Sequence, residues 1–240
     1  MLRSTDFSNL TSKVILFTSD IAFDQGQALA ALLADLQGIF NGQITTLPLP
    51  PGAPGEIPRI TLGSSDEIKS LEAGPERLSI LFHAKDGKIE TVDDQVNLAL
   101  RSLAAYKVAL KCRISRLAIN VSHIFAIPNP AMVIARYFCK EKLLERRDDF
   151  KGALSRTEKM ELHAHKRFDL KEGLTVNSWV RIKTLLQQQD QSTGILVEQD
   201  INTLGERANT ADFSNDEIDS IIREMFSESR TIMKLYFEGV

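Results

Sequence analysis

The chain is poor in cysteine and has no long apolar run. Only two of its 240 residues are cysteines, Cys112 and Cys139, too few for the disulfide framework of a small secreted protein. No apolar run approaches the ~20 residues that cross a bilayer, so we expect no membrane association. These absences favour a soluble, cytoplasmic protein with two buried, reduced thiols. One disulfide between the two cysteines is the alternative.

The short motifs that identify common enzymes are also missing. The sequence contains no G-x-x-x-x-G-K-[ST] loop for phosphates, no dinucleotide-binding G-x-G-x-x-G turn, no G-x-S-x-G nucleophile elbow and no C-x-x-C pair. After the first apolar run, residues 18–27 hold a single glycine, Gly26, whereas a phosphate-cradling turn needs several. No motif therefore requires a cofactor. Enzymatic activity is left open and is not favoured.

The charge balance excludes a strongly basic protein. Lys and Arg number 29 and Asp and Glu 32, for a formal net charge of −3, so the chain as a whole has no attraction for nucleic acid. The charge is uneven, however: residues 136–171 carry eleven Lys and Arg against seven Asp and Glu, and the rest carries eighteen against twenty-five. A hydrophobic content of 43% is ordinary for a globular protein and argues against disorder.

The clearest strand lies in mid-chain, between Cys112 and Pro130. Large apolar residues alternate there with small or polar ones, and this period of two predicts a strand with one buried face. The apolar face carries Leu117, Ile119, Val121, Phe125 and Ile127, and the other face Ala118, Asn120, Ser122 and Ala126. His123 falls on the apolar register. We expect it to be a core histidine whose hydrogen bonds are satisfied.

Residues 1–112 and 113–240 are expected to repeat one order of elements: strand, helix, several strands, long helix. Asp24, Thr91 with Asp94, and Ser214 with Glu217 are typical helix starts. In the first half we expect a strand at 14–17, a helix at 25–40, an irregular proline-rich connection at 42–58, strands at 57–62 and 77–85, a hairpin through Asp86-Gly87 into 88–91, and a helix at 92–110. Residues 65–74 are either a helical turn or a strand.

In the second half the mid-chain strand leads to a helix that begins at Pro130, with Asn129 as its N-cap. A charged loop follows around residues 146–149, then strands at 159–170, 174–186 and 194–204 and the closing helix. The repeated order predicts two pseudo-duplicated halves in one compact unit, without a linker.

The expected fold class is α+β. Consecutive strands with short turns predict an antiparallel sheet, and the long amphipathic helices predict one helix-covered face. We therefore expect a curved antiparallel sheet whose other face is open, an arrangement that resembles the helix-grip folds of TATA-binding-protein-like domains. A doubly wound parallel fold is the alternative, less favoured because strands and helices do not alternate one for one.

A second resemblance concerns turn and strand residues of the first half. The segments Ile57-Pro58-Arg59-Ile60, Ser64-Ser65-Asp66 and Leu71-Glu72-Ala73-Gly74-Pro75-Glu76-Arg77-Leu78, with the mid-chain strand and the terminal helix, resemble a sporadically distributed family of uncharacterised bacterial proteins. The resemblance covers the order of elements along most of the chain. It supports the predicted organisation and implies no activity.

The open face of the later strands is the expected place of function. Its binding candidates are Asn120, Arg167, Trp179, Arg181 and Lys183. Trp and Arg are enriched among the residues that anchor protein interfaces. We therefore expect a binding or protein-interaction module, which associates with itself as a homo-oligomer such as a dimer or binds another protein.

Three alternatives compete for the same face. His163 and His165 lie on one side of a strand with Glu161, and two imidazoles with a carboxylate suit zinc or iron, as in a metal-dependent hydrolase. Arg167, Arg181 and Lys183 around Trp179 suit phosphates and a stacked base of nucleic acid, although interleaved acidic residues oppose this use. The third alternative is a solvated face without a ligand.

Overall fold

The computed structural model describes residues 2–19, 22–50, 52–144, 154, 157–171, 173–186, 193–207 and 211–238. The first half contains β1 (Ser8–Ser19), α1 (Gln25–Leu36), β2 (Ile44–Thr46), β3 (Ile60–Gly63), β4 (Lys69–Gly74), β5 (Arg77–His83) and α2 (Val92–Ala109). The second half contains β6 (Arg113–Ala126), α3 (Pro130–Phe138), β7 (Glu161–Asp169), β8 (Thr175–Leu186), β9 (Thr193–Thr203) and α4 (Asn215–Phe237). Short 3-10 helices occupy Ser4–Asp6, Glu141–Leu143 and Gly205–Arg207.

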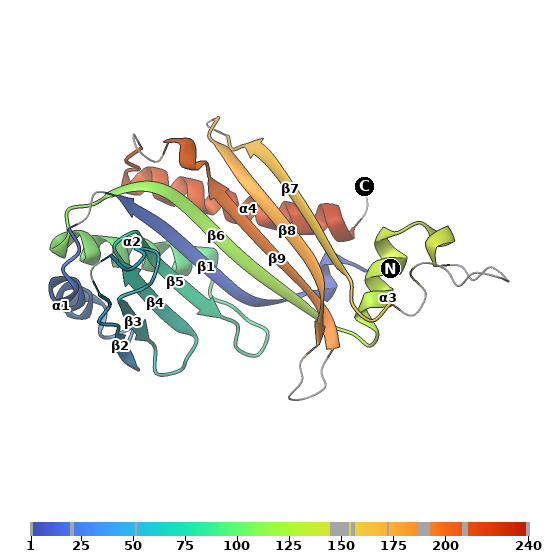
Figure 1. Ribbon diagram of the computed structural model, residues 1–240, viewed down its shortest axis with the longest axis horizontal. Helices are drawn as coiled ribbons and strands as arrows, with labels where there is room; N and C mark the ends of the chain where they lie inside the picture. Colours follow the sequence, from blue (N-terminus) through green and yellow to red (C-terminus); the bar gives the residue numbers. More distant parts are fainter. Residues whose placement is uncertain are drawn as a thin grey trace.

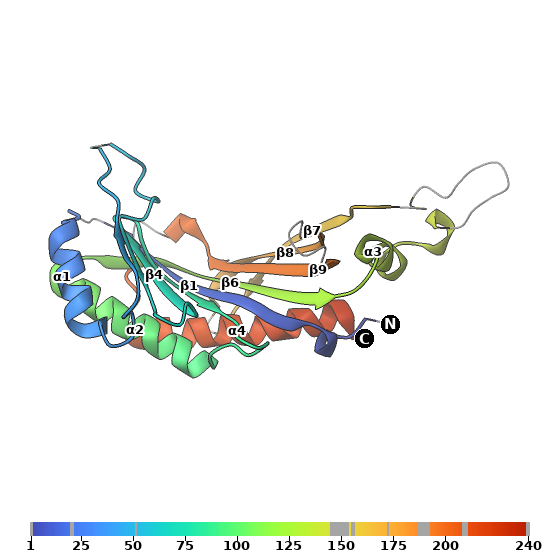
Figure 2. The same ribbon diagram turned by 90° about the horizontal axis from the view of Figure 1, so that it is seen from below.

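One antiparallel sheet runs through both halves, with nine strands in the order β2-β3-β4-β5-β1-β6-β9-β8-β7 (Figure 1). β1 and β6 lie side by side at its centre, and the pairings between the strands are antiparallel, so the doubly wound alternative is wrong. α1, α2 and α4 lie against one face, and α3 lies at one end of the sheet (Figure 2). The α+β class is confirmed. Duplication of the two halves stays a prediction.

The helix starts follow from their capping residues. Asp24 accepts a hydrogen bond from the backbone N–H of Gln27 at the start of α1, and Thr91 accepts one from Asp94 at the start of α2. Ser214 and Glu217 form the predicted capping box of α4. Each cap satisfies a backbone donor that has no partner inside the helix. Asn129 precedes α3 in a left-handed conformation, and its side chain forms no capping bond.

The first half departs from the prediction in two places, and it decides a third that the sequence left open. The turn at Asp86-Gly87 exists, with positive φ at both residues, but no strand follows; a single bridge joins Lys85 to Lys88. The proline-rich connection contains the short strand β2. The undecided segment 65–74 is a turn followed by β4. The charged loop predicted around residues 146–149 lies outside the described residues.

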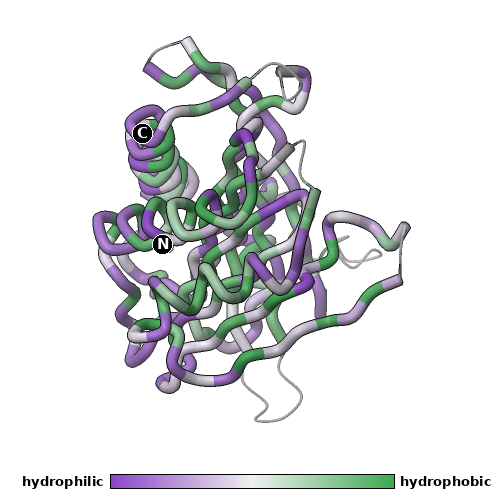
Figure 3. Tube along the Cα trace, turned by 90° about the vertical axis from the view of Figure 1, so that its left-hand side faces the viewer, coloured by the Kyte–Doolittle hydropathy of each residue, from purple (hydrophilic) through white to green (hydrophobic). Residues whose placement is uncertain are grey.

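The core lies between the sheet and the helices. In β6, Leu117 and Ile119 are fully buried and Val121 is nearly so, as the period of two predicted. Hydrophobic and hydrophilic residues also alternate along the strands and the helices in Figure 3. No α-helix of the described part of the chain covers the other face of the sheet (Figure 2).

Both cysteines are free and half-buried, so no disulfide joins them. Burial raises the pKa of the Cys112 thiol above its usual value, which disfavours the reactive thiolate. Within the described ranges, no helix is both long and apolar enough to span a lipid bilayer.

Candidate functional site

The open face of β6, β9, β8 and β7 brings the predicted site residues together. Strand register places Asn120 opposite Asp200, Asp200 opposite Trp179, and Trp179 opposite His165. A second row runs beside the first and contains Ser122, Glu198, Arg181 and His163. Because side chains at every second position share a face, Glu161, Arg167 and Lys183 lie on this face too. The predicted candidates therefore form one continuous surface, which we call the open polar face.

A hollow of 320 Å³ lies in the middle of the open polar face. It is lined chiefly by Asn120, Ser122, Trp179, Arg181, Glu198 and Asp200. Trp179 is 39% exposed, and its ring stacks on that of His165 with 4.1 Å between centroids and 18° between planes. The stack fixes the indole as one wall of the hollow.

Charged side chains around the hollow differ in how they are engaged. Lys183 Nζ lies 2.8 Å from a carboxylate oxygen of Glu198. Asp200 accepts a hydrogen bond from Asn202 at 2.9 Å. Arg181 is exposed, and its guanidinium has no hydrogen bond or ion pair with any described residue. The hollow therefore offers one unpaired cation beside an exposed aromatic ring, within a rim of both signs.

The two histidines of the metal hypothesis are engaged separately. His163 Nε2 lies 2.8 Å from Glu161, and this hydrogen bond lowers the pKa of the Glu161 carboxyl. His165 stacks on Trp179 and lies 3.3 Å from Asn177 Oδ1. In the part of the chain that the structure describes, no three His, Cys, Asp or Glu side chains are grouped so as to hold a metal ion. Among these described residues, the proposed metal site of the hydrolase alternative therefore lacks a complete set of three ligands.

The nucleic-acid alternative also meets a specific difficulty. Arg167, Arg181 and Lys183 share the open polar face with Trp179, as predicted, but cross-strand neighbours bring acids among them. Glu198 lies opposite Arg181 and Asp200 lies opposite Trp179. A phosphate chain laid across this surface would meet carboxylates as often as cations, which weakens the counterion release that drives such binding.

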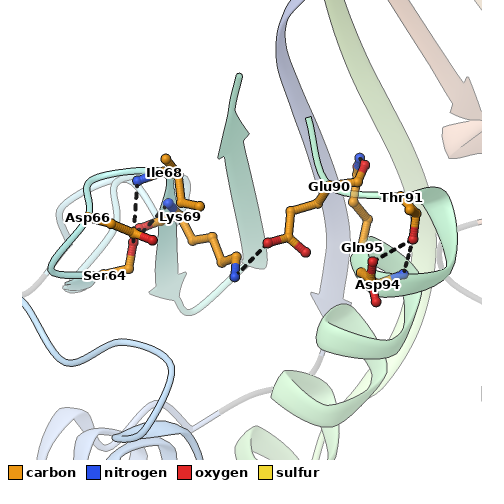
Figure 4. Close-up of polar contacts among 8 residues, drawn as sticks. All are labelled: Ser64, Asp66, Ile68, Lys69, Glu90, Thr91, Asp94 and Gln95. Carbon is orange, nitrogen blue, oxygen red and sulfur yellow. Dashed lines mark hydrogen bonds and ion pairs between the residues drawn. The ribbon is translucent and has the colours of Figure 1, made fainter. Parts of the chain in front are cut away.

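A second hollow, which the sequence did not predict, lies on the helical side of the sheet. Its volume is 720 Å³, and it lies between the start of α2 and α4, over β1 and β6. Ser12 Oγ donates a 2.6 Å hydrogen bond to Gln95 Oε1, and Gln95 Nε2 donates to the Glu90 carbonyl. Lys69 on β4 holds the Glu90 carboxylate at 2.7 Å (Figure 4). We call this hollow the helical-face cleft.

His123 lines the helical-face cleft. The prediction that its hydrogen bonds are satisfied is wrong, because its buried Nδ1 has no partner among the described residues. Burial lowers the pKa of His123 to about 4, since the loss of surrounding water disfavours the charged imidazolium. In the sequence, the residues of the helical-face cleft are marked only as polar side chains at positions where the pattern expects apolar ones, namely Ser12, Gln95 and His123.

The two resemblances described from the sequence stay predictions. Comparison of the chain with protein-family models, curated proteins and solved structures gave no match.

Proposed function

We propose that this protein is a binding module that recognises a protein partner through the open polar face. The observation that carries the proposal is the hollow in which half-exposed Trp179 lies beside Arg181, whose guanidinium has no partner among the described residues. Large aromatic and Arg side chains of this kind supply much of the binding energy at protein interfaces. A ligand that covers this pair gains apolar contact and a cation partner at one place.

The rigidity of the surface supports the same proposal. The lining residues stand on β6, β8 and β9 in the middle of the second half of the sheet, so little backbone conformational entropy is lost on binding. Charges of both signs around the hollow suit a protein surface with complementary charges better than a uniformly anionic polymer. Self-association and a cytoplasmic location are finer parts of this proposal.

The proposal is tested by crosslinking the protein to its partners in an extract of the native host. We expect a Trp179→Ala, Arg181→Ala variant to lose the partner, because both anchors are removed. A Thr61→Ala, Ser70→Ala variant is the matched control, since Thr61 on β3 and Ser70 on β4 occupy the same sheet face in the first half. Equal capture by all three folded proteins contradicts the proposal.

A further inference from the structure

The two edges of the sheet differ in how they are protected. β2, at one edge, has three residues, and β7, at the other, has nine. Natural proteins keep exposed edges short, or interrupt them with proline or a bulge, because an unpaired strand invites another strand. β7 contains no proline and pairs with β8 without a register shift. It is therefore a long, regular edge.

Backbone bonds show which groups of β7 face outward. Leu170 N–H donates to the Leu174 carbonyl, and Thr184 N–H donates to the Met160 carbonyl. Even-numbered residues of β7 thus bond to β8, and the alternation of an antiparallel ladder directs the N–H and C=O groups of odd-numbered residues away from it. Five residues, 161, 163, 165, 167 and 169, present these groups at the edge. No described strand pairs with them.

Charges along the edge complement one another when a second copy is laid antiparallel about Ala164. Residues whose numbers add to 328 then face each other, and this register pairs odd with odd, as the outward backbone groups require. Glu161 meets Arg167 of the second copy, and Lys159 meets Asp169 of the second copy. The two-fold axis produces each pair twice. Opposite charges directly across a ladder stabilise it.

The neighbouring registers that also pair odd-numbered residues with odd-numbered residues lose this charge match. Centred on His165, the pairing sets Glu161 against Asp169 of the second copy. Centred on His163, it sets Arg167 against Lys159 of the second copy. Like charges directly opposite each other destabilise a ladder, so the charge pattern selects the register about Ala164.

The helical side of the same edge also has apolar surface to cover. A groove of 200 Å³ is lined by residues that include Ala164, Lys166, Leu235 and Tyr236. Leu235 on α4 is 54% exposed. A strand added at β7 lies next to this groove and shields part of it.

We infer that two copies of this chain associate through β7, antiparallel about Ala164, into one continuous sheet. The inference rests on the proposed function, because it names a second copy as a partner and enlarges the same open polar face. The two β7 strands separate the two β8 strands, which carry Trp179 and lie three strand spacings apart, about 14 Å across the sheet. The assembled face thus presents two equal anchors.

An engineered disulfide tests the register. At a non-hydrogen-bonded antiparallel pair the Cα atoms are about 4.5 Å apart, within the range that a disulfide spans. Ala164→Cys should therefore form a covalent dimer under mild oxidation. Lys166→Cys is the matched control: its two copies lie four residues apart along the strands, about 13 Å, and should stay uncrosslinked. The unsubstituted protein controls for Cys112 and Cys139.

Charge reversal gives a second measurement that does not depend on the new cysteine. Arg167→Glu alone, or Glu161→Arg alone, turns two attractive pairs into two repulsive ones and should raise the dimer dissociation constant about tenfold or more. An equal mixture of the two variants should form a heterodimer, because Arg then faces Glu at every such pair. Sedimentation velocity measures each state.

The inference is overturned if the unsubstituted protein stays monomeric and Ala164→Cys does not crosslink, or if the mixed variants associate no better than each alone. These outcomes are separate from a failure of the proposed function. Capture of a partner that depends on Trp179 by a monomeric protein would contradict the β7 pairing alone. A β7 dimer whose Trp179→Ala, Arg181→Ala variant keeps every partner would contradict the open polar face as a recognition surface.

Discussion

Acidification should destabilise the fold through His123. Burial lowers the pKa of His123 to about 4 in the folded protein, whereas the pKa of a histidine in the unfolded chain is about 6.5. As the pH falls below about 6.5, the His123 imidazole takes up a proton in the unfolded chain but stays neutral in the folded chain. The free energy of unfolding therefore decreases. Each pKa unit corresponds to about 1.4 kcal/mol, and the loss between about pH 7 and about pH 5 is about 2 kcal/mol.

The surroundings of His123 reinforce this direction. The same cleft is lined by three cations of α4, Arg223, Arg230 and Lys234. It is also lined by two acids, Glu90 just before α2 and Asp93 in its first turn. Asp93 pairs with Arg223, and Glu90 pairs with Lys69. A proton on the imidazole would thus add charge to a cleft whose two acids are already paired with cations.

Urea unfolding followed by circular dichroism measures the effect at both pH values. The matched variant is His123→Gln, which stays polar but does not titrate. The unsubstituted protein should lose about 2 kcal/mol more than the variant between the two pH values, and groups common to both proteins cancel in this difference. An equal loss in both proteins would refute the argument that His123 is buried in its neutral form.

Three further substitutions test the packing. Ser12→Ala removes the donor to buried Gln95 Oε1 and should cost about 1–3 kcal/mol in urea unfolding; a negligible change would mean that another group satisfies this oxygen. Ile119→Ala opens a cavity in the central strand β6, where Ile119 is fully buried, and should cost about 2–5 kcal/mol; a loss well below that range would contradict this core placement. Trp179→Ala removes a half-exposed ring stacked on His165 and should cost about 1 kcal/mol in a thermal melt, whereas loss of the folded state would contradict its placement on an open face.

The fold was predictable where local patterns were strong. The alternation in β6 assigned both faces of the central strand, and the capping residues Asp24, Thr91 and Ser214 located three helix starts. β2 was not predictable, because three residues within a proline-rich stretch carry too little periodicity. The strand expected after Asp86-Gly87 is reduced to one bridge between Lys85 and Lys88, and Thr91 already caps α2 three residues later.

The open polar face was predictable because it depends on strand parity alone. Once β7 and β8 are correctly assigned, His165 and Trp179 must lie on one side of the sheet. The helical-face cleft was not predictable, because Ser12, Gln95 and His123 come from three distant segments that only the tertiary fold brings together. The lack of a described partner for Arg181 was not predictable either. Its cross-strand neighbours bind other side chains: Glu198 pairs with Lys183, and His163 lies against Glu161.

Fluorescence of Trp179 tests the central claim most directly. Trp179 is the only tryptophan of the chain, so under selective excitation its emission reports on the open polar face. A crosslinked partner, once purified in a form without tryptophan, is titrated into the protein. We predict a saturable change in Trp179 emission and weaker binding by an Arg181→Ala variant. Binding of the partner with unchanged emission, and with equal affinity for the Arg181→Ala variant, would contradict recognition through this face.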